Sequence, residues 1–228
     1  MDLFVNSQSV MKILLVSATE KEISPLLATM GIKNYVGDHL RICKHKDNDV
    51  DVLVTGIGMT AAAFWLGKIL SNQYDMAINF GLAGSFNQDL KIGSVVNIVQ
   101  EHFAELGAED GEKFLSLSEI GLSGISEVVN ETKISNKVLE EIPMVCGITV
   151  NKVHGNEKSI EKIFSKFHPN TESMEGAAFL FACAYEKIPC AQIRAISNFV
   201  EKRNKDKWNI PLAIKNLNEK AIQILDTF

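Results

Sequence analysis

The 228-residue chain has few of the residues that mark several common protein classes. Its four cysteines form no CxxC pair, so neither a disulfide framework nor a zinc ribbon is indicated. Its five histidines do not fall at metal-ligand spacing either. No stretch reaches the roughly 18 apolar residues that a membrane span requires. We therefore expect reduced thiols, a cytoplasmic location, no metal and no membrane partner.

The chain also lacks an excess of positive charge. It has 23 Lys and Arg against 28 Asp and Glu, for a net charge of −5, whereas a nucleic-acid-binding domain would carry a basic patch. Its 46% hydrophobic content is that of an ordinary globular protein. We therefore expect a small-molecule partner and no nucleic acid.

No Pro-rich or Ser-rich linker divides the chain, so a single domain over residues 11–228 is predicted. Residues 1–10 lack the basic start and the long apolar core of a signal peptide. Met11 directly precedes the first strong strand pattern. We interpret residues 1–10 as an N-terminal extension outside the fold.

Short apolar runs alternate with helical patterns along the sequence. Strands are expected at residues 12–17, 40–46, 50–55, 76–80, 94–100, 145–150 and 191–198. Helices are expected at residues 19–30, 60–72, 156–167, 171–189 and 209–225, with mostly loop at 107–135. This alternation predicts an α/β protein whose mixed, mostly parallel sheet has both faces covered.

Two glycine turns follow expected strands. The first, TGIGMTAAA at 55–63, contains G-x-G-x-x-A, but a dinucleotide site needs an acid at the end of the next strand, which here ends in Phe80-Gly81. It can be a tight strand-to-helix turn or a turn that contacts another ligand. The second, NFGLAGS at 79–85, can offer backbone N–H groups to a flat heterocycle or an anion. No cofactor is indicated, and a ligand is expected at this rim, the carboxyl ends of the strands.

These turns belong to a series of segments that resembles the nucleoside phosphorylase and nucleosidase superfamily. In chain order the segments are MKILLVSATEKEISPLL, VLVTGIGMTAAA, INFGLAGSFNQDLKIGSVV, ESMEGAAF and IRAISN. The resemblance covers roughly residues 11 to 225. It implies a three-layer α/β/α phosphorylase-like fold around a twisted sheet, a purine nucleoside as substrate, a homo-oligomeric state and no cofactor.

The resemblance also implies roles for acids at two expected helix starts. Glu175 matches the carboxylate that binds both ribose hydroxyls, and Met174 matches the residue that packs under the sugar. Glu22 matches the acid that positions and deprotonates water in the nucleosidases. The alternative for Glu22, Glu175 and the neighbouring Glu20 is pairing with the helix dipole. Glu172 matches no family role and is expected to be a surface acid.

The segment after the first strand favours hydrolysis over phosphorolysis. Hexameric phosphorylases of the family carry a glycine-arginine loop there, whereas this chain has Ser-Ala-Thr-Glu-Lys-Glu at 17–22, without arginine. Two acids would repel a phosphate dianion and suit a water nucleophile. Leu82 departs from the family pattern, which often has a serine at this position, and so leaves the water with fewer partners.

The strand that ends in RAISN indicates which base departs. Adenine-cleaving nucleosidases end this strand in aspartate, whereas this chain has Asn198. An amide can donate an N–H to O6 of a 6-oxopurine and accept from a protonated N7, which a carboxylate cannot do together. Ala83, Gly84 and Val153 are expected to contact the same base through their backbones. A strand-end turn residue is the alternative for Asn198.

The segment FVEKRNKDKWNIPLAIKNLN resembles the futalosine hydrolase branch of the family. That branch removes hypoxanthine from futalosine during menaquinone biosynthesis. Arg203, Lys205 or Lys207 can pair with the substrate carboxylate, and Trp208 or Phe199 can lie against its aryl ring. A solvated charged loop is the alternative reading of the basic residues. Methylthioadenosine-type nucleosidases, purine nucleoside phosphorylases and non-catalytic nucleoside-binding proteins stay open as rival functions.

Overall fold

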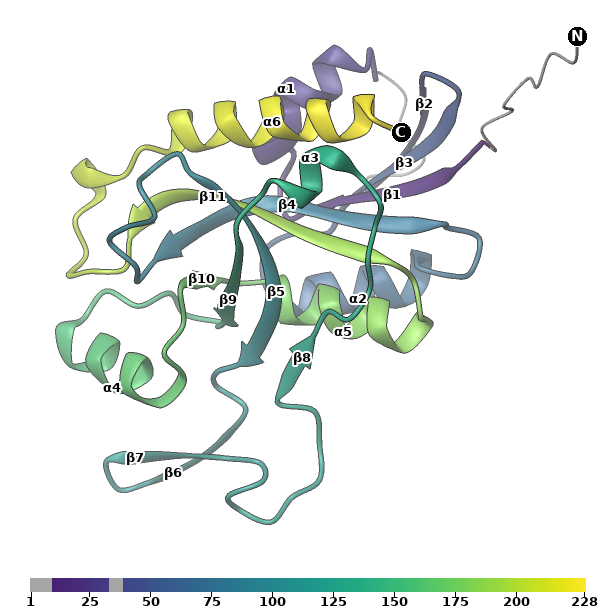
Figure 1. Cartoon of the computed structure of the whole chain (residues 1–228). Coiled ribbons are helices and arrows are strands. Elements are labelled where there is room, and N and C mark those ends of the chain that lie inside the picture. The colour runs from purple at the N-terminus through teal and green to yellow at the C-terminus, as the bar shows by residue number, and fades with distance from the viewer. Residues whose placement is uncertain (1–9, 33–38) are drawn as a thin grey trace, which may run out of the picture.

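The computed structural model describes residues 10–32 and 39–228, and its centre is a mixed nine-stranded sheet (Figure 1). The sheet strands are β1 Lys12–Ser17, β2 Leu40–His45, β3 Asn48–Val54, β4 Met76–Ser85, β5 Val95–Phe103, β8 Glu127–Val129, β9 Met144–Thr149, β10 Thr171–Ser173 and β11 Cys190–Phe199. The helices are α1 Glu20–Thr29, α2 Met59–Ile69, α3 Lys137–Glu140, α4 Glu157–Phe167, α5 Gly176–Glu186 and α6 Ile210–Asp226, with a 3-10 turn at Lys205–Lys207.

The sheet closes on itself at one end. Its order is β10-β9-β5-β11-β4-β1-β3-β2, and β10 also pairs with β4, so the first five strands form a ring. The neighbouring strands β11, β4, β1 and β3, in this order across the sheet, run parallel to one another. The neighbours β5, β9 and β10 form a second parallel group. Antiparallel pairing of β11 with β5 joins the two parallel groups. The predicted mixed sheet is confirmed.

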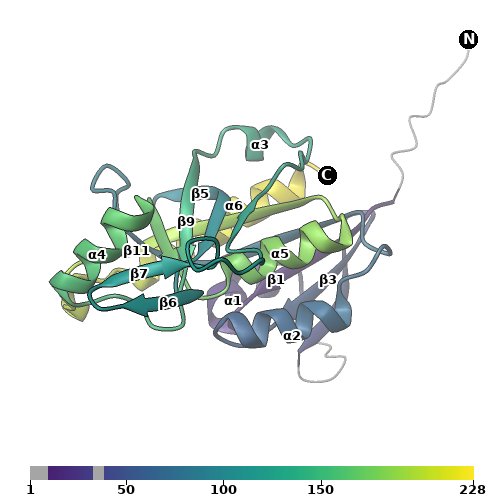
Figure 2. The same cartoon turned by 90° about the horizontal axis from the view of Figure 1, so that it is seen from below.

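Helices cover both faces of the sheet, as Figures 1 and 2 show. In β1, Ile13 and Leu15 pack in one hydrophobic cluster with α1 and α6. Leu14 and Val16 point the other way and pack in a second cluster with α2 and α5. The apolar run of β1 is therefore buried on both faces, as is typical of a central strand. The three-layer α/β/α fold predicted from the resemblance is confirmed.

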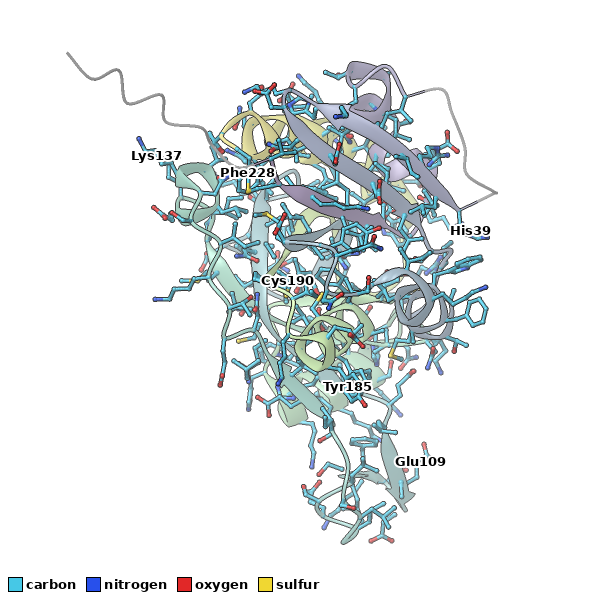
Figure 3. All side chains as sticks on the ribbon, turned by 90° about the vertical axis from the view of Figure 1, so that its right-hand side faces the viewer. His39, Glu109, Lys137, Tyr185, Cys190 and Phe228 are labelled. Atoms are coloured by element: carbon cyan, nitrogen blue, oxygen red, sulfur yellow. The ribbon has the colours of Figure 1, made fainter. Side chains whose placement is uncertain are left out.

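Two expected elements differ from the structure. Residues 171–189 do not form one helix, because Thr171–Ser173 is the strand β10, paired with both β9 and β4, and α5 begins only at Gly176. The expected loop at 107–135 contains the hairpin β6 Gly107–Asp110 and β7 Lys113–Ser116, followed by β8. This hairpin, marked by Glu109 in Figure 3, projects from the body of the molecule.

No helix in the described part of the chain is long and apolar enough to cross a membrane. Residues 1–9 of the expected N-terminal extension lie outside the described residues.

Candidate active site

A cavity of about 300 Å³ lies where the carboxyl ends of β1, β4, β10 and β11 meet. Its lining includes the residues predicted to activate water or to contact the sugar and the base: Glu22, Ala83, Gly84, Val153, Met174, Glu175 and Asn198. Of the residues suggested for the rest of the substrate, the lining includes Trp208 but not Phe199, Arg203, Lys205 or Lys207. Segments far apart in the chain are thus brought to one rim, as the carboxyl-end rule for such sheets predicts.

Glu22, in the lining of this cavity, is fixed by the start of α1. Its Oε2 accepts hydrogen bonds from the N–H and the hydroxyl of Thr19, both at 2.9 Å. Its Oε1 accepts from the N–H of Leu82 at 3.2 Å, so the carboxylate also spans to the glycine turn in β4. Glu22 therefore caps the start of α1 and also faces the cavity. Leu82 donates a hydrogen bond to it from the backbone N–H, in place of the side-chain hydroxyl that a serine would offer.

Glu175 precedes α5 and is held by the other glycine turn. The N–H of Gly58 donates to its Oε1 at 2.8 Å. Gly58 has φ 97°, a conformation that favours glycine, and it lies directly before α2. Burial raises the pKa of Glu175, and the negative charge of Glu22 acts in the same direction. The G-x-G-x-x-A turn thus positions a carboxylate of the site.

Asn198 stands beside Gly84 near the end of β11. Its Oδ1 accepts from the Ser197 hydroxyl at 2.8 Å, and its Nδ2 donates to the Phe199 carbonyl at 2.9 Å. A Cβ on Gly84 would lie 3.1 Å from the Asn198 nitrogen, so glycine makes room for the amide. An amide has two N–H donors and two acceptor lone pairs, which leaves one of each for a ligand.

Glu172 is buried, and the expectation of a surface acid was wrong. Only 4% of it is exposed, because it belongs to β10 inside the ring of strands. Its Oε1 accepts from the N–H of His154 at 2.9 Å, and its Oε2 pairs with Nδ1 of the same histidine. Both residues line the cavity. His154 was not predicted as a site residue, since a lone histidine in a loop carries no spacing signal.

Two further charged groups lie buried beside the site. Arg194 is 1% exposed, donates to the Ile193 carbonyl at 3.2 Å, and packs its guanidinium against Gly81. Glu101 is also 1% exposed, and burial raises its pKa to about 7. Its carboxyl accepts from Thr149 at 2.9 Å and from Gln192 at 2.6 Å. Nothing in the sequence around Glu101, near the end of β5, indicates that this acid is buried.

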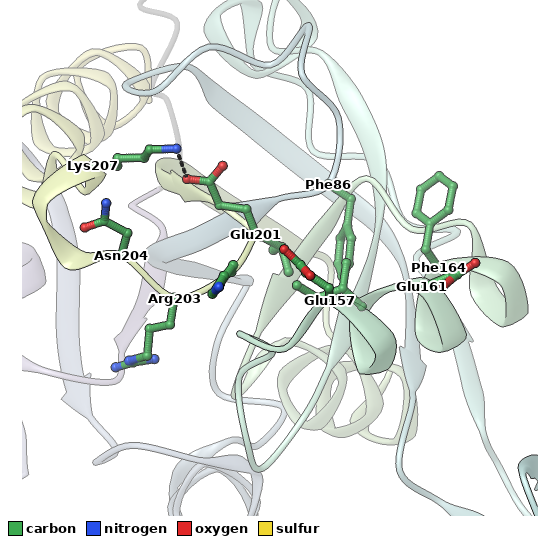
Figure 4. A pocket seen from close by; sticks show the side chains of 11 residues that line it. Phe86, Glu157, Glu161, Phe164, Glu201, Arg203, Asn204 and Lys207 are labelled. Atoms are coloured by element: carbon green, nitrogen blue, oxygen red, sulfur yellow. Dashed lines mark ion pairs between the residues drawn. The ribbon is translucent and has the colours of Figure 1, made fainter.

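Arg203 lines a second cavity of about 840 Å³ between α4 and the segment that follows β11 (Figure 4). Its guanidinium carbon lies 5.1 Å from the ring centre of Trp208, which lines the first cavity. Its N–H donates to the Gly155 carbonyl at 3.1 Å. Lys207 in the same segment pairs with Glu201 at 2.9 Å. Arg203 therefore does not line the first cavity but contacts Trp208, which does.

The described residues include no cluster of three or more His, Cys, Asp or Glu side chains that could hold a metal ion.

Comparison with known proteins agrees with this fold. The sequence model of the phosphorylase superfamily matches residues 12–228. A futalosine hydrolase of Acidothermus cellulolyticus is 28% identical over 180 residues, which cover 73% of this chain and 71% of that protein. A 5'-methylthioadenosine/S-adenosylhomocysteine nucleosidase of Glaesserella parasuis is 26% identical over 231 residues, covering 96% of this chain and all of that protein (100%).

Among solved structures, that of futalosine hydrolase from Helicobacter pylori superimposes with a TM-score of 0.81 at 18% identity, covering 96% of this chain and 99% of that one. At this identity the likeness shows the fold alone. Because the family match spans nearly the whole chain, this protein belongs to the phosphorylase superfamily.

Proposed function

We propose that this protein is an N-ribosyl hydrolase that releases the base of a purine nucleoside, with futalosine as its substrate and hypoxanthine as the leaving base. The observation that carries this proposal is the composition of one cavity: two carboxylates, Glu22 and Glu175, share it with the neutral amide of Asn198. The relatives named futalosine hydrolase and nucleosidase support the reaction class.

Glu175 binds the ribose of the substrate. One carboxylate oxygen is already held by Gly58, which fixes the direction of the group. A carboxylate retains lone pairs on both oxygens after one such bond, so it can accept from the 2′- and 3′-hydroxyls together. Met174 lies next to it in the same lining and packs under the ribose.

Glu22 is the base that activates water. Three of its hydrogen bonds come from Thr19 and Leu82, which hold the carboxylate in place. A water at the free lone pair of Oε1 gives its proton to Glu22 as its oxygen attacks C1′ of an oxocarbenium-like ribosyl group. A positioned base of this kind contributes roughly 10²–10⁴-fold to the rate.

Asn198 receives the departing base. Its unused N–H donates to O6, and its unused lone pair accepts from N7 once N7 carries a proton. An adenine base would place its 6-amino donor against the N–H of the amide. The backbones of Ala83, Gly84 and Val153 lie in the same lining and complete the contacts to the base.

Water rather than phosphate is the proposed nucleophile. Within the described part of the chain, no arginine lines the cavity, and its basic residues are Lys21 and His154. His154 is paired with Glu172, so this carboxylate compensates any positive charge on the imidazole. A phosphate dianion would therefore lie between two carboxylates with little to compensate it.

The second candidate is a methylthioadenosine-type nucleosidase, because the relative with that name matches 96% of this chain. The two candidates differ in the base they release. Incubation with futalosine, inosine and methylthioadenosine, each with and without phosphate, followed by chromatography of the products, separates them. Phosphate-independent release of hypoxanthine from futalosine is expected. Adenine release alone would establish the second candidate, and strict phosphate dependence would establish a phosphorylase.

The homo-oligomeric state implied by the resemblance stays a prediction, which light scattering of the purified chain would test.

A further inference from the structure

The proposed reaction lacks a proton donor on the side of the base. As the C1′–N9 bond breaks, its electron pair moves to the purine, and protonation of N7 relieves the resulting negative charge. Asn198 can hold the protonated base, but an amide has no proton to give at neutral pH. A further group with acid–base chemistry is therefore needed in the cavity.

His154 is such a group, and Glu172 determines its orientation. Glu172 holds both the backbone N–H and Nδ1 of His154, so the loop position and the ring direction are fixed by one carboxylate. The next residue, Gly155, accepts from Arg203, and a Cβ on Gly155 would lie 3.0 Å from the Arg203 Cβ, which ties the loop down further. Nε2, on the far side of the ring from Glu172, makes no hydrogen bond within the described part of the chain.

The pair lies beside the amide that receives the base. Glu172 in β10 is registered opposite Gly84 in β4, and Asn198 in β11 is registered with the same Gly84 from the other side. Neighbouring strands are spaced about 4.8 Å apart, so Glu172 and Asn198 flank one backbone position. His154, Glu172 and Asn198 all line the same cavity of about 300 Å³.

We propose that His154, oriented by Glu172, is the catalytic acid that protonates the departing purine; this inference rests on the proposed function. The imidazolium gives its Nε2 proton to N7 while the C1′–N9 bond breaks and its electrons remain on the purine. Glu22 takes a proton from the water that bonds to C1′. His154 then regains a proton from solvent, and Glu22 releases one, so the cycle balances. Glu172 stabilises the imidazolium and acts as a positioning residue.

The test compares two leaving groups in the variant His154→Asn. The asparagine amide can keep a hydrogen bond to Glu172 from about the place of Nδ1, but it has no ionisable proton. Cleavage of the hypoxanthine nucleoside is expected to fall by about 10²–10⁴-fold. Hydrolysis of 4-nitrophenyl β-D-ribofuranoside, whose leaving group needs no proton, is expected to change less than threefold. The dissociation constant of hypoxanthine, measured by calorimetry, is also expected to change less than threefold.

The matched control is His45→Gln, because His45 also pairs with a carboxylate, Asp226, at 2.9 Å but outside the cavity. It is expected to leave both reactions unchanged.

Unchanged purine release by His154→Asn would overturn the proposal. So would hypoxanthine affinity that falls in step with turnover, because His154 would then bind the base without protonating it, and so would equal losses on both substrates.

Glu172→Gln tests the positioning role separately. It keeps an acceptor for the His154 backbone but loses the charge, so purine release is expected to fall by about tenfold or more while the nitrophenyl riboside is spared. A merely structural role would reduce both rates together. The proposed function itself would fail if the wild-type protein bound hypoxanthine but cleaved no purine nucleoside. The role of His154 is tested separately, by comparing its variant with a wild type that is active.

Discussion

The backbone N–H of Gly58 donates to the Glu175 carboxylate over 2.8 Å, although the two residues are 117 positions apart in the chain. Gly58 directly precedes α2 and Glu175 directly precedes α5, and these two helices pack together on one face of the sheet. The contact joins the starts of the two helices at the rim of the cavity. The orientation of the proposed ribose acid therefore depends on a glycine with φ 97°.

Gly58→Ala should weaken the site through the backbone alone. A Cβ at Gly58 would meet no atom within 4 Å, so the direct cost is the backbone strain of φ 97° with ψ 156°, a region essentially confined to glycine, of about 1–3 kcal/mol. Relief of this strain turns the N–H away from Glu175, and we expect the KM for the nucleoside to rise several-fold. Gly67→Ala is the control, because it lies in α2 with equal space and no positive φ, and it should stabilise the fold by about 0.5–1 kcal/mol. Equal KM values in both variants would refute the positioning role of Gly58.

Glu22→Gln should preserve substrate binding and lose turnover. The glutamine keeps a carbonyl oxygen for the donors on Thr19 or Leu82 but cannot accept a proton from water. A loss of about 10²–10⁴-fold in kcat is expected, with little change in the dissociation constant of hypoxanthine. Glu20→Gln, two residues earlier, is the control: Glu20 pairs with Arg41 at 2.7 Å and does not line the cavity. A kcat within threefold of wild type for Glu22→Gln would remove water activation from this residue.

Asn198→Asp should reverse the preference between bases. A carboxylate in place of the amide would lose the N–H donated to the Phe199 carbonyl and the N–H proposed for O6. It would instead accept from the 6-amino group of adenine. We expect kcat/KM to fall at least about tenfold for a hypoxanthine nucleoside and to fall less, or rise, for methylthioadenosine. A fall of equal size for both substrates would show that residue 198 does not read the base.

Local sequence patterns were sufficient for the strands that lead to Glu22 and to Asn198. These two side chains follow or end an apolar run, so the rule that ligands bind at the carboxyl ends of strands brought them to one rim, whereas Glu175 was assigned from the family resemblance. The strand β10 was not predicted, because three residues have no usable periodicity and their ladder partners lie in β9 and β4. The burial of Glu172 follows from that pairing and was missed with it.

Arg203 shows a different limit of sequence reasoning. Its charge and its place after β11 predicted a substrate contact, but side-chain direction in an irregular segment is set by neighbours such as Trp208 and Gly155. That Arg203 binds substrate stays a prediction, because its side chain lies against the ring of Trp208 and does not line the first cavity. Sequence spacing could not separate these two cavities.

Burial raises the pKa of Glu101 to about 7 from an ordinary 4.5, so the stability of the protein should depend on pH. Between these two values the folded chain holds a proton that the unfolded chain has released, so the contribution of Glu101 to stability is present below pH 4.5 and is lost as the pH rises toward 7. At about 1.4 kcal/mol per pKa unit, the loss is at most about 4 kcal/mol. Glu101→Gln has no such titration.

The variant should also fit the site, because Oε1 of Gln192 has no hydrogen-bond partner within the described part of the chain. A flip of the Gln192 amide would let that oxygen accept from the new amide of residue 101, while Thr149 keeps its acceptor. We therefore expect urea unfolding to show wild-type stability falling relative to the variant between pH 5 and pH 7, and a constant difference above about pH 8. A stability difference that does not change with pH would mean that Glu101 is ionised throughout this range, held by Arg194, whose positive charge lowers its pKa.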